Sequence, residues 1–356
     1  MSGWLSSLQR QYGIVIYRYV KTLRGIWLET NRGAMVFQSL PVAFLPKAEF
    51  VYKVNLKLQR TSLMFPILKN SEGEIVTQIG EQAYFMIGSP ISSSSWVDYG
   101  KLGSRLAEFH SISVECLEGV TDSFSEIGRW PRAWQSKYEQ LERFESVAQA
   151  RIGTEEQDPF DAFFVNNAAY FRQLTELSLM RLETCDYEAI CDDTFPFGRL
   201  SFTNFSYETI TLNQFGQPFF TDPFSLVEDT RVRDLAQFIK ADVRLYGWDP
   251  SRIYTFLAAY HAVSPITPNE FQLMYALILL PGRLLKKVET LYYRPSLFRS
   301  ETTHLELYRG ETETMTAEVA YTEMRRAELL IQDFPLFARR YFGVSLPPLV
   351  EIGELS

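Results

Sequence analysis

The first part of the chain alternates apolar and polar positions in short runs separated by turn signals. Residues 13–40 contain three β-rich runs, which are broken at L-R-G (23–25) and at N-R-G (31–33), and the second break is typical of a hairpin turn. The pattern predicts an antiparallel meander. From Pro46 to Arg60, apolar side chains recur at helical spacing, and proline suits the first turn of a helix. A helix is therefore expected after the meander.

Two further β-like stretches follow this helix. They read GEIVTQI (73–79) and QAYFMIG (82–88), and a turn around residues 71–73 introduces the first of them. Residues 1–90 are therefore predicted to form a five-stranded sheet with one inserted helix. The serine run at 92–95, which we interpret as turn chemistry rather than as a flexible linker, marks the boundary.

Helical periodicity dominates the chain from Trp96 onward, beginning with an apolar stripe over residues 102–109. A β pattern returns once, at about 198–226. These features predict an α+β protein with a sheet-containing part at 1–90 and a mainly helical part at 91–356 that carries a β insert. Further amphipathic helical segments are expected at 130–182, 253–262, 270–293 and 313–342.

Composition and charge narrow the class of protein. With 356 residues, 46% of them hydrophobic, the chain is long enough for a large core, and a small disulfide-stapled fold is excluded. The formal net charge of −8 argues against a general nucleic-acid-binding surface, so nucleic acid is not an expected partner. The three cysteines (Cys116, Cys185 and Cys191) are scattered without a C-x-x-C motif, which argues against a zinc site and predicts a reducing, cytoplasmic location. The first twenty-one residues contain Arg10, Arg18 and Lys21 and no run of 18 apolar residues, so we expect neither a cleaved signal peptide nor a membrane span there.

Several segments resemble, in the right order, the aminoglycoside and choline phosphotransferase group of kinase-like proteins. YGKLGSRLAEFH (99–110) is similar to the group's "LG..LA.FH" helix, and FTNFSYETITL (202–212) resembles its His-Gly-Asp-x-x-x-x-Asn catalytic loop. Residues 219–240 resemble the strand, the metal-binding Asp and the helix that follow that loop, and residues 258–293 are similar to the end of the CotS- and YutH-like spore coat branch. The resemblance covers about four-fifths of the chain and implies a two-lobed, protein kinase-like fold.

The catalytic positions that the resemblance implies are mostly changed. In phosphoryl transfer of this type an Asp accepts the substrate proton, an Asn and a second Asp hold magnesium, and a Lys contacts the phosphates. With the motif aligned on Phe205-Ser206, its His becomes Phe202, its catalytic Asp becomes Asn204 and its metal-binding Asn becomes Thr209. A carboxamide cannot act as a carboxylate base, and Thr is a poorer magnesium ligand. Only Asp222, at the position of the magnesium Asp, is retained as a candidate metal ligand, and Asp222-Pro223 also suits a turn.

A second alignment does not restore the site. Shifting the register by one residue places Thr203 at the Asp position and Glu208 at the Asn position, which recovers a metal ligand but no base. An active enzyme would then need a displaced acid, for which Glu208 and Asp229 are the candidates.

The nucleotide-binding end is also degenerate. Gln38 stands where the resemblance implies a phosphate-binding lysine, and the loop between the first two strands has no G-x-G pair. Glu49 is the candidate for the helix Glu that would pair with that lysine. Lys47 and Lys53 are possible substitutes for the lysine, but we interpret both as part of a solvated helix face.

Other chemically interesting residues have structural interpretations. His110 ends an apolar helix and is expected to be a packed histidine, and the resemblance implies that Asp234 braces the catalytic loop. The aromatic clusters at 195–197 and 219–220 border the former active cleft and are candidates to fill it. The tract at 313–342 has acids early and arginines late, as a docking helix would.

Three functional hypotheses follow from these departures. The first is a pseudokinase, a spore coat-associated scaffold or interaction protein with protein partners, no phosphoryl-transfer activity and no expected cofactor. The second is an active ATP-dependent small-molecule phosphotransferase with a displaced acid, Asp222 on magnesium and Mg-ATP as cofactor. The third is a module that binds a non-nucleotide ligand in the same cleft. The resemblance leaves two locations open, the cytoplasm of the mother cell and the surface of the spore coat.

Overall fold

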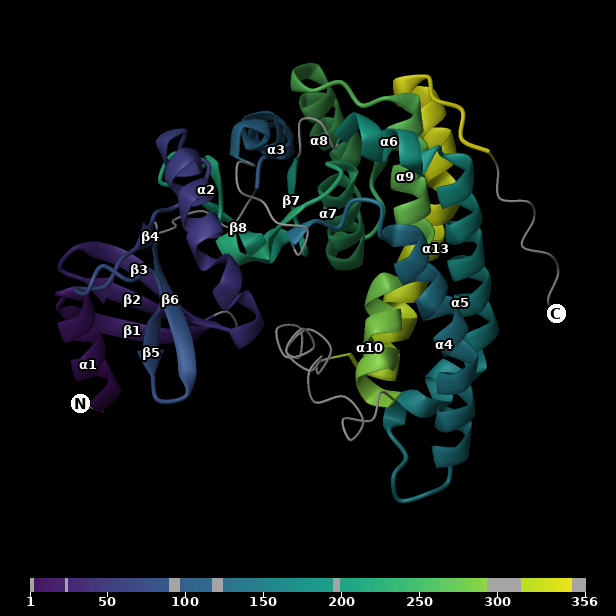
Figure 1. Ribbon diagram of the computed structural model, residues 1–356. Helices are drawn as coiled ribbons and strands as arrows, with labels where there is room; N and C mark the ends of the chain where they lie inside the picture. Colours follow the sequence, from purple (N-terminus) through teal and green to yellow (C-terminus); the bar gives the residue numbers. More distant parts are fainter. Residues whose placement is uncertain are drawn as a thin grey trace.

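The computed structural model describes residues 3–22, 25–89, 97–116, 124–194, 199–292 and 315–347. An antiparallel sheet flanked by helices forms the N-terminal lobe, and a larger, mainly helical C-terminal lobe lies beside it (Figure 1). The predicted α+β, two-lobed architecture is confirmed. The serine run at 92–95 and the aromatic cluster at 195–197 lie outside the described residues.

The meander predicted at 13–40 is present, and the two later β-like stretches pair with it in one sheet. The sheet has six strands in place of the expected five, because a two-residue strand, too short to show a period, pairs with β6. Its main path runs β1-β2-β3-β6-β4, and β5 also pairs with β6. The strands are β1 (Ile16–Thr22), β2 (Gly25–Thr30), β3 (Gly33–Leu40), β4 (Ile67–Leu68), β5 (Thr77–Ile79) and β6 (Gln82–Gly88).

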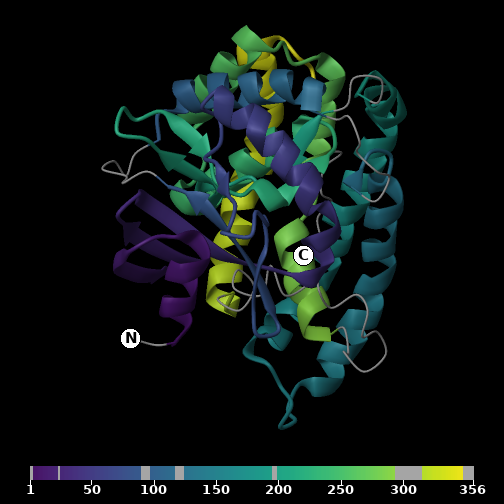
Figure 2. The same ribbon diagram turned by 60° about the vertical axis from the view of Figure 1, so that its left-hand side comes forward.

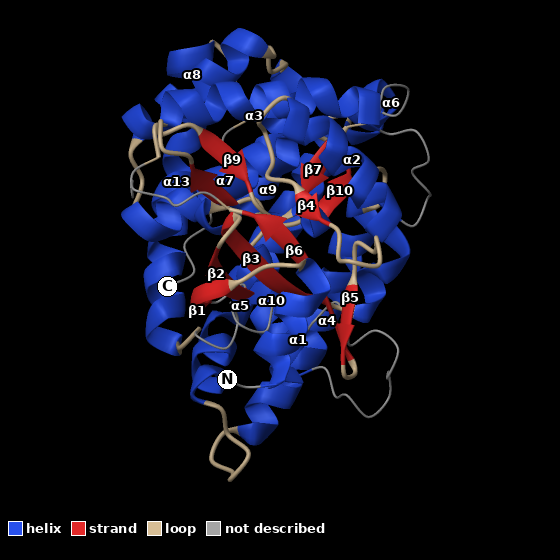
Figure 3. Cartoon of the chain, turned by 90° about the vertical axis from the view of Figure 1, so that its left-hand side faces the viewer, coloured by secondary structure: helices blue, strands red, loops and turns tan. Residues whose placement is uncertain are grey.

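Helices cover both faces of this sheet (Figures 1 and 3). Alternate residues along a strand point to opposite faces, so Met35 and Phe37 of β3 pack with Leu8 of α1 (Gly3–Tyr12), while Leu40 packs with Val51 on the other side. The prediction of a single helix in this lobe was therefore incomplete: α1 buries one face and α2 (Ala48–Arg60) the other.

Helix α2 belongs to the cores of both lobes. Its Val51 lies in the core of the sheet lobe, whereas Val54 and Leu58, further along the helix, lie in the core of the helical lobe. The chain after α2 continues this connection, since the Phe220 amide donates to the Leu63 carbonyl at 2.8 Å. The short 3₁₀ helix η1 (Val42–Lys47) leads into α2.

Helices of the C-terminal lobe occupy the segments predicted to be helical, and a further helix at 187–194 was not predicted. Figure 2 shows the long helices running side by side. The closest approach is between α3 and α8, where a Cβ on Gly103 would lie 2.1 Å from the Phe256 carbonyl oxygen. These helices are α3 (Tyr99–Ser113), α4 (Trp130–Arg151), α5 (Pro159–Thr184), α6 (Tyr187–Thr194), α7 (Val232–Tyr246), α8 (Pro250–Val263), α9 (Pro268–Leu279), α10 (Gly282–Tyr292) and α13 (Ala317–Phe342), with the 3₁₀ turn η2 (Val114–Cys116) after α3. Among the described helices, none is both long and apolar enough to cross a membrane.

The predicted β insert forms two small antiparallel pairs between the sheet lobe and the helices (Figure 1). Strand β7 pairs with β10, and β8 pairs with β9. The insert extends slightly beyond the expected end because β10 closes the first pair. Its elements are β7 (Leu200–Phe202), η4 (Tyr207–Thr209), β8 (Ile210–Leu212), β9 (Pro218–Phe220), η5 (Pro223–Ser225) and β10 (Leu226–Glu228).

Candidate functional site

The loop between β7 and η4 is held by side chains of helix α7. The Asp234 carboxyl accepts a hydrogen bond from the Phe202 amide at 2.8 Å. One turn later, the Gln237 side chain accepts from the Phe205 amide at 2.6 Å and donates to the Thr203 carbonyl at 3.0 Å. Because the last two bonds lie on either side of Asn204, the backbone at this position is fixed from both directions.

A buried histidine supports Asp234 from behind. His110 is fully buried, with Nε2 at 3.0 Å from Asp234 Oδ2 and Nδ1 at 2.7 Å from the Tyr260 hydroxyl. Burial raises the pKa of Asp234 well above its ordinary value and lowers the pKa of His110 well below its own, and nearby Arg231 lowers the latter further. Burial therefore favours the neutral form of each group. His110 is the packed histidine that the sequence predicts, and Asp234 braces the loop.

Phe202 is part of an aromatic core under the loop. Its ring is fully buried, with centroid distances of 5.0 Å to Phe109, 5.4 Å to Phe205 and 5.5 Å to Phe220. These distances are typical of aromatic packing. Phe202, which the resemblance aligns with the histidine of the motif, therefore packs in the hydrophobic core. Phe220, from the aromatic pair expected to fill the cleft, is part of the same packing.

A second polar cluster anchors the far end of the loop. The Tyr207 and Tyr99 hydroxyls both donate to Asp242 Oδ1, at 2.5 Å and 2.7 Å, and Arg252 pairs with the other carboxylate oxygen at 3.0 Å. Asp242 lies on α7 as Asp234 does, so this single helix fixes the loop at its start, its middle and its end.

Thr209 and Glu208 do not assemble a metal site. The Thr209 hydroxyl donates to the Ser206 carbonyl at 2.7 Å and accepts from the Ser206 amide at 3.0 Å, which closes a capping box around η4. The Thr209 side chain is thus used locally, and Glu208 beside it is exposed. In the part of the chain that the structure describes, no three His, Cys, Asp or Glu side chains come together to hold a metal ion.

Asp229, the other candidate acid, is buried and already bonded. Its carboxylate accepts from Trp130 Nε1 at 3.0 Å and from the Thr230 amide at 2.7 Å, and Arg233 lies 2.7 Å away. Burial raises its pKa to about 6, against the opposing effect of Arg233. These bonds connect the residue after β10 to α4, and the carboxylate is already bound by Trp130 and Arg233.

Lys47, interpreted from sequence as part of a solvated face, is buried, so that interpretation was wrong. Its Nζ donates to the Leu226 carbonyl of β10 at 3.1 Å and lies 4.4 Å from the Phe44 ring. Burial lowers the pKa of Lys47 to about 8, although the Asp222 carboxylate acts in the opposite direction. Lys53, on the helix α2 that follows Lys47, is exposed as expected. The sequence analysis named Lys47 as a possible substitute for the lysine but not its burial, and the only signal for that burial was its place beside Pro46 at the start of a helix.

The other nucleotide-site positions do not form the expected pair. Gln38 is buried in β3, on the sheet face that packs against α2, and its Cγ lies 3.0 Å from where a Cβ on Gly25 would be. Gly25 is therefore required to let the β1–β2 hairpin pack this closely. Glu49 is exposed on α2. Asp222, which is partly buried, begins η5 and receives the Ser225 hydroxyl on its main-chain carbonyl at 2.8 Å.

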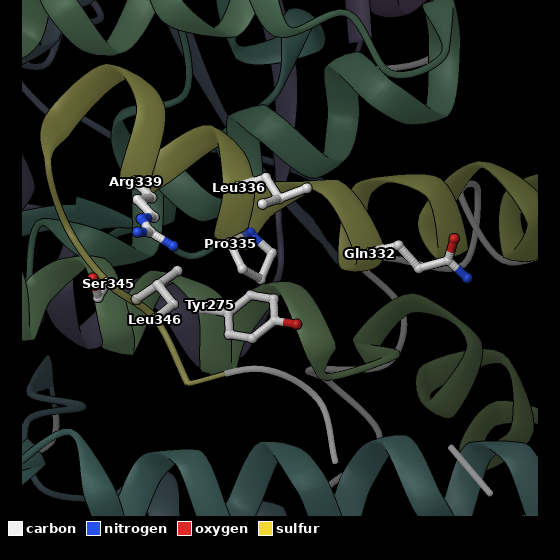
Figure 4. Close-up of a pocket in the computed structure, with 7 residues that line it drawn as sticks. All are labelled: Tyr275, Gln332, Pro335, Leu336, Arg339, Ser345 and Leu346. Carbon is white, nitrogen blue, oxygen red and sulfur yellow. The ribbon is translucent and has the colours of Figure 1, made fainter. Parts of the chain in front are cut away.

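A separate cavity of about 450 Å³ lies on the C-terminal helices, and α13 is distant from the sheet lobe in Figure 1. Tyr275 of α9 lies beside Pro335, and Leu336 and Arg339 also come from α13 (Figure 4). The cavity is therefore distinct from the region around Asp222.

A sheet lobe and a helical lobe, with a braced loop and Asp222 between them, are the arrangement of the kinase-like phosphotransferase fold. The chain superposes on an aminoglycoside phosphotransferase from Alicyclobacillus acidocaldarius with a TM-score of 0.65 at 14% identity, covering 94% of this chain and 96% of that one. A spectinomycin phosphotransferase bound to ADP and spectinomycin gives a TM-score of 0.56 at 14% identity, covering 90% and 98%. These likenesses show the fold.

Sequence comparison identifies the family to which the chain belongs. The model of the family described as "Spore coat putative kinase YutH" matches residues 7–323, so the chain belongs to this family. It is 27% identical to Spore coat protein S of Bacillus subtilis (strain 168) over 72% of this chain and 73% of that protein. Endospore coat-associated protein YutH of the same organism is 24% identical, over 72% and 74%.

Proposed function

We propose that this chain is a pseudokinase that transfers no phosphoryl group and acts as an interaction or scaffold component of the spore coat. One observation carries the proposal. The frame that would hold a catalytic carboxylate is intact, since Asp234 and Gln237 fix the loop on both sides, yet the residue in that frame is Asn204. A carboxamide has no basic oxygen to accept a substrate proton at neutral pH.

The surroundings of Asn204 support the same proposal. Asp229 is held by Trp130 and Arg233, so a role as a displaced base would require breaking these buried bonds. The Thr209 hydroxyl is used in its capping box. The coat assignment rests on the family and on the two coat relatives, and it predicts protein partners in coat assembly.

The test is the melting temperature of the full chain with and without Mg-ATP, with Asp222→Ala measured alongside. A ligand that binds only the folded state raises the melting temperature, so the pseudokinase is expected to show no shift in either protein. ADP release is followed in the same samples. ATP consumption that disappears in Asp222→Ala would refute the proposal.

The second candidate function is an active ATP-dependent small-molecule phosphotransferase. One observation favours it: a buried ammonium, Lys47, lies in the cleft close enough to Asp222 to interact with it, although the lysine position on β3 is Gln38. Mg-ATP would then be the cofactor, with Asp222 on the metal and a displaced acid as base. A shift of several degrees that is lost in Asp222→Ala would support this function. Stabilisation by a ligand other than ATP would instead favour a binding module.

A further inference from the structure

A lysine ammonium from the sheet lobe crosses to the β insert beside Asp222. Lys47 is only 5% exposed, and its Nζ donates to the carbonyl of Leu226 in β10. Nζ also lies 4.4 Å from the centre of the Phe44 ring, and the Asp222 carboxylate acts to raise the pKa of Lys47 against the effect of burial. The ammonium thus joins the start of α2 to the segment that begins at Asp222.

Burial of this ammonium has a free-energy cost, and a neutral side chain of the same size would fill the space without that cost. An ammonium that leaves water loses its hydration, and a single carbonyl and one nearby carboxylate compensate only part of that loss. Methionine has a side chain of similar length and would fill the same space without a charge. The charge at position 47 therefore points to a role other than filling the core.

The segment that Lys47 holds also positions the loop. Phe224, in the middle of the segment, packs in the core of the sheet lobe with its ring 4.5 Å from that of Phe85. The Ser225 carbonyl accepts from the Thr203 amide at 2.8 Å, next to Asn204. A cation that fixes residues 222–226 against α2 therefore also fixes the loop relative to the sheet lobe.

We propose that the Lys47 ammonium is an internal cation that takes the place of a divalent metal at Asp222 and holds the two lobes in one arrangement. The inference rests on the proposed function, because an active cleft would need Asp222 for magnesium. A monovalent ammonium supplied by the chain makes the arrangement of the cleft independent of added metal.

Hydrogen exchange on the full chain tests this proposal with Lys47→Met and a matched control, Lys53→Met, in which an exposed lysine of the adjoining helix α2 is changed. Amides of residues 222–228, and of Thr203, are expected to exchange about tenfold faster in Lys47→Met than in wild type. Lys53→Met is expected to match wild type. The melting temperature of Lys47→Met should equal or exceed that of wild type, because the buried charge is removed. Unchanged exchange in a folded Lys47→Met protein would overturn the proposal.

A measurement on the wild-type protein tests the same proposal without relying on that variant. Manganese(II) is titrated into wild type and Asp222→Ala and followed by electron paramagnetic resonance, and both are expected to leave the ion free. Manganese bound to wild type but not to Asp222→Ala would overturn the internal cation. ATP consumption by wild type would refute the proposed function itself, whereas unchanged exchange without ATP consumption would refute only the role of Lys47.

Discussion

The buried contact between Asp234 and His110 makes a specific prediction about charge. Both side chains are fully buried, and burial disfavours the charged form of each. In a neutral pair the Asp234 hydroxyl donates to His110 Nε2, while the other carboxyl oxygen accepts from the Phe202 amide. An asparagine provides the same donor and acceptor with nearly the same shape. Asp234→Asn is therefore expected to change the free energy of unfolding by less than about 1 kcal/mol.

Asp234→Ala serves as the contrasting variant. It leaves two buried groups without partners, the Phe202 amide and His110 Nε2, and each unsatisfied group costs about 1–3 kcal/mol. The expected loss is about 2–5 kcal/mol when the cavity is included. Because Phe202 leads into the loop, the loss should also release residues 203–206.

Urea unfolding at neutral pH, followed by tryptophan fluorescence, measures both variants against wild type. The reasoning requires a large difference between them. If Asp234→Asn were as unstable as Asp234→Ala, the Asp234 carboxyl would have to be ionised in the native protein, because an asparagine has one acceptor oxygen and cannot replace a carboxylate that accepts on both.

Three further predictions concern packing and buried charge. Gly103→Ala is expected to destabilise the protein by several kcal/mol, because its Cβ would lie 2.1 Å from the Phe256 carbonyl oxygen. Gly100→Ala, on the same helix, is the control, since its Cβ would meet its nearest atom at 3.3 Å. Equal urea midpoints for the two variants would contradict the α3–α8 packing. Trp130→Phe removes the donor to the buried Asp229 carboxylate and should cost about 1–3 kcal/mol, measured in the same way; an unchanged midpoint would show that this bond contributes nothing. Burial lowers the pKa of Lys240, which donates to the Leu277 and Leu280 carbonyls, to about 7 from its ordinary 10.5. Between pH 7 and 10.5 the unfolded chain therefore binds more protons at Lys240 than the folded chain does, so the free energy of unfolding should rise with pH over this range. The rise should be smaller in Lys240→Met. Identical pH profiles for the two proteins would refute the prediction.

Local patterns were sufficient for most of the secondary structure and for the chemistry of the positions that the resemblance assigned to the site. The meander at 13–40 and the helix after Pro46 were predictable because each side-chain period is a local property of the chain. The residue types at positions 38, 204 and 209 fix which functional groups are present, whatever surrounds them. That the Asn204 side chain cannot act as a base could therefore be inferred from the sequence. Helix α1 and the two-residue strand β4 were missed, the second because two residues show no period.

Only the tertiary structure decided how these groups are used. Lys47 and Leu226 are 179 residues apart, and a helical pattern around Lys47 does not indicate which distant segment packs against it. The same holds for Asp229, an acid available in sequence but bonded to Trp130 in the fold. Residue types and their spacing thus determined the elements and the available chemistry, because both depend on near neighbours. Burial, hydrogen-bond partners and protonation depend on contacts between distant segments, and these exist only once the two lobes have packed together.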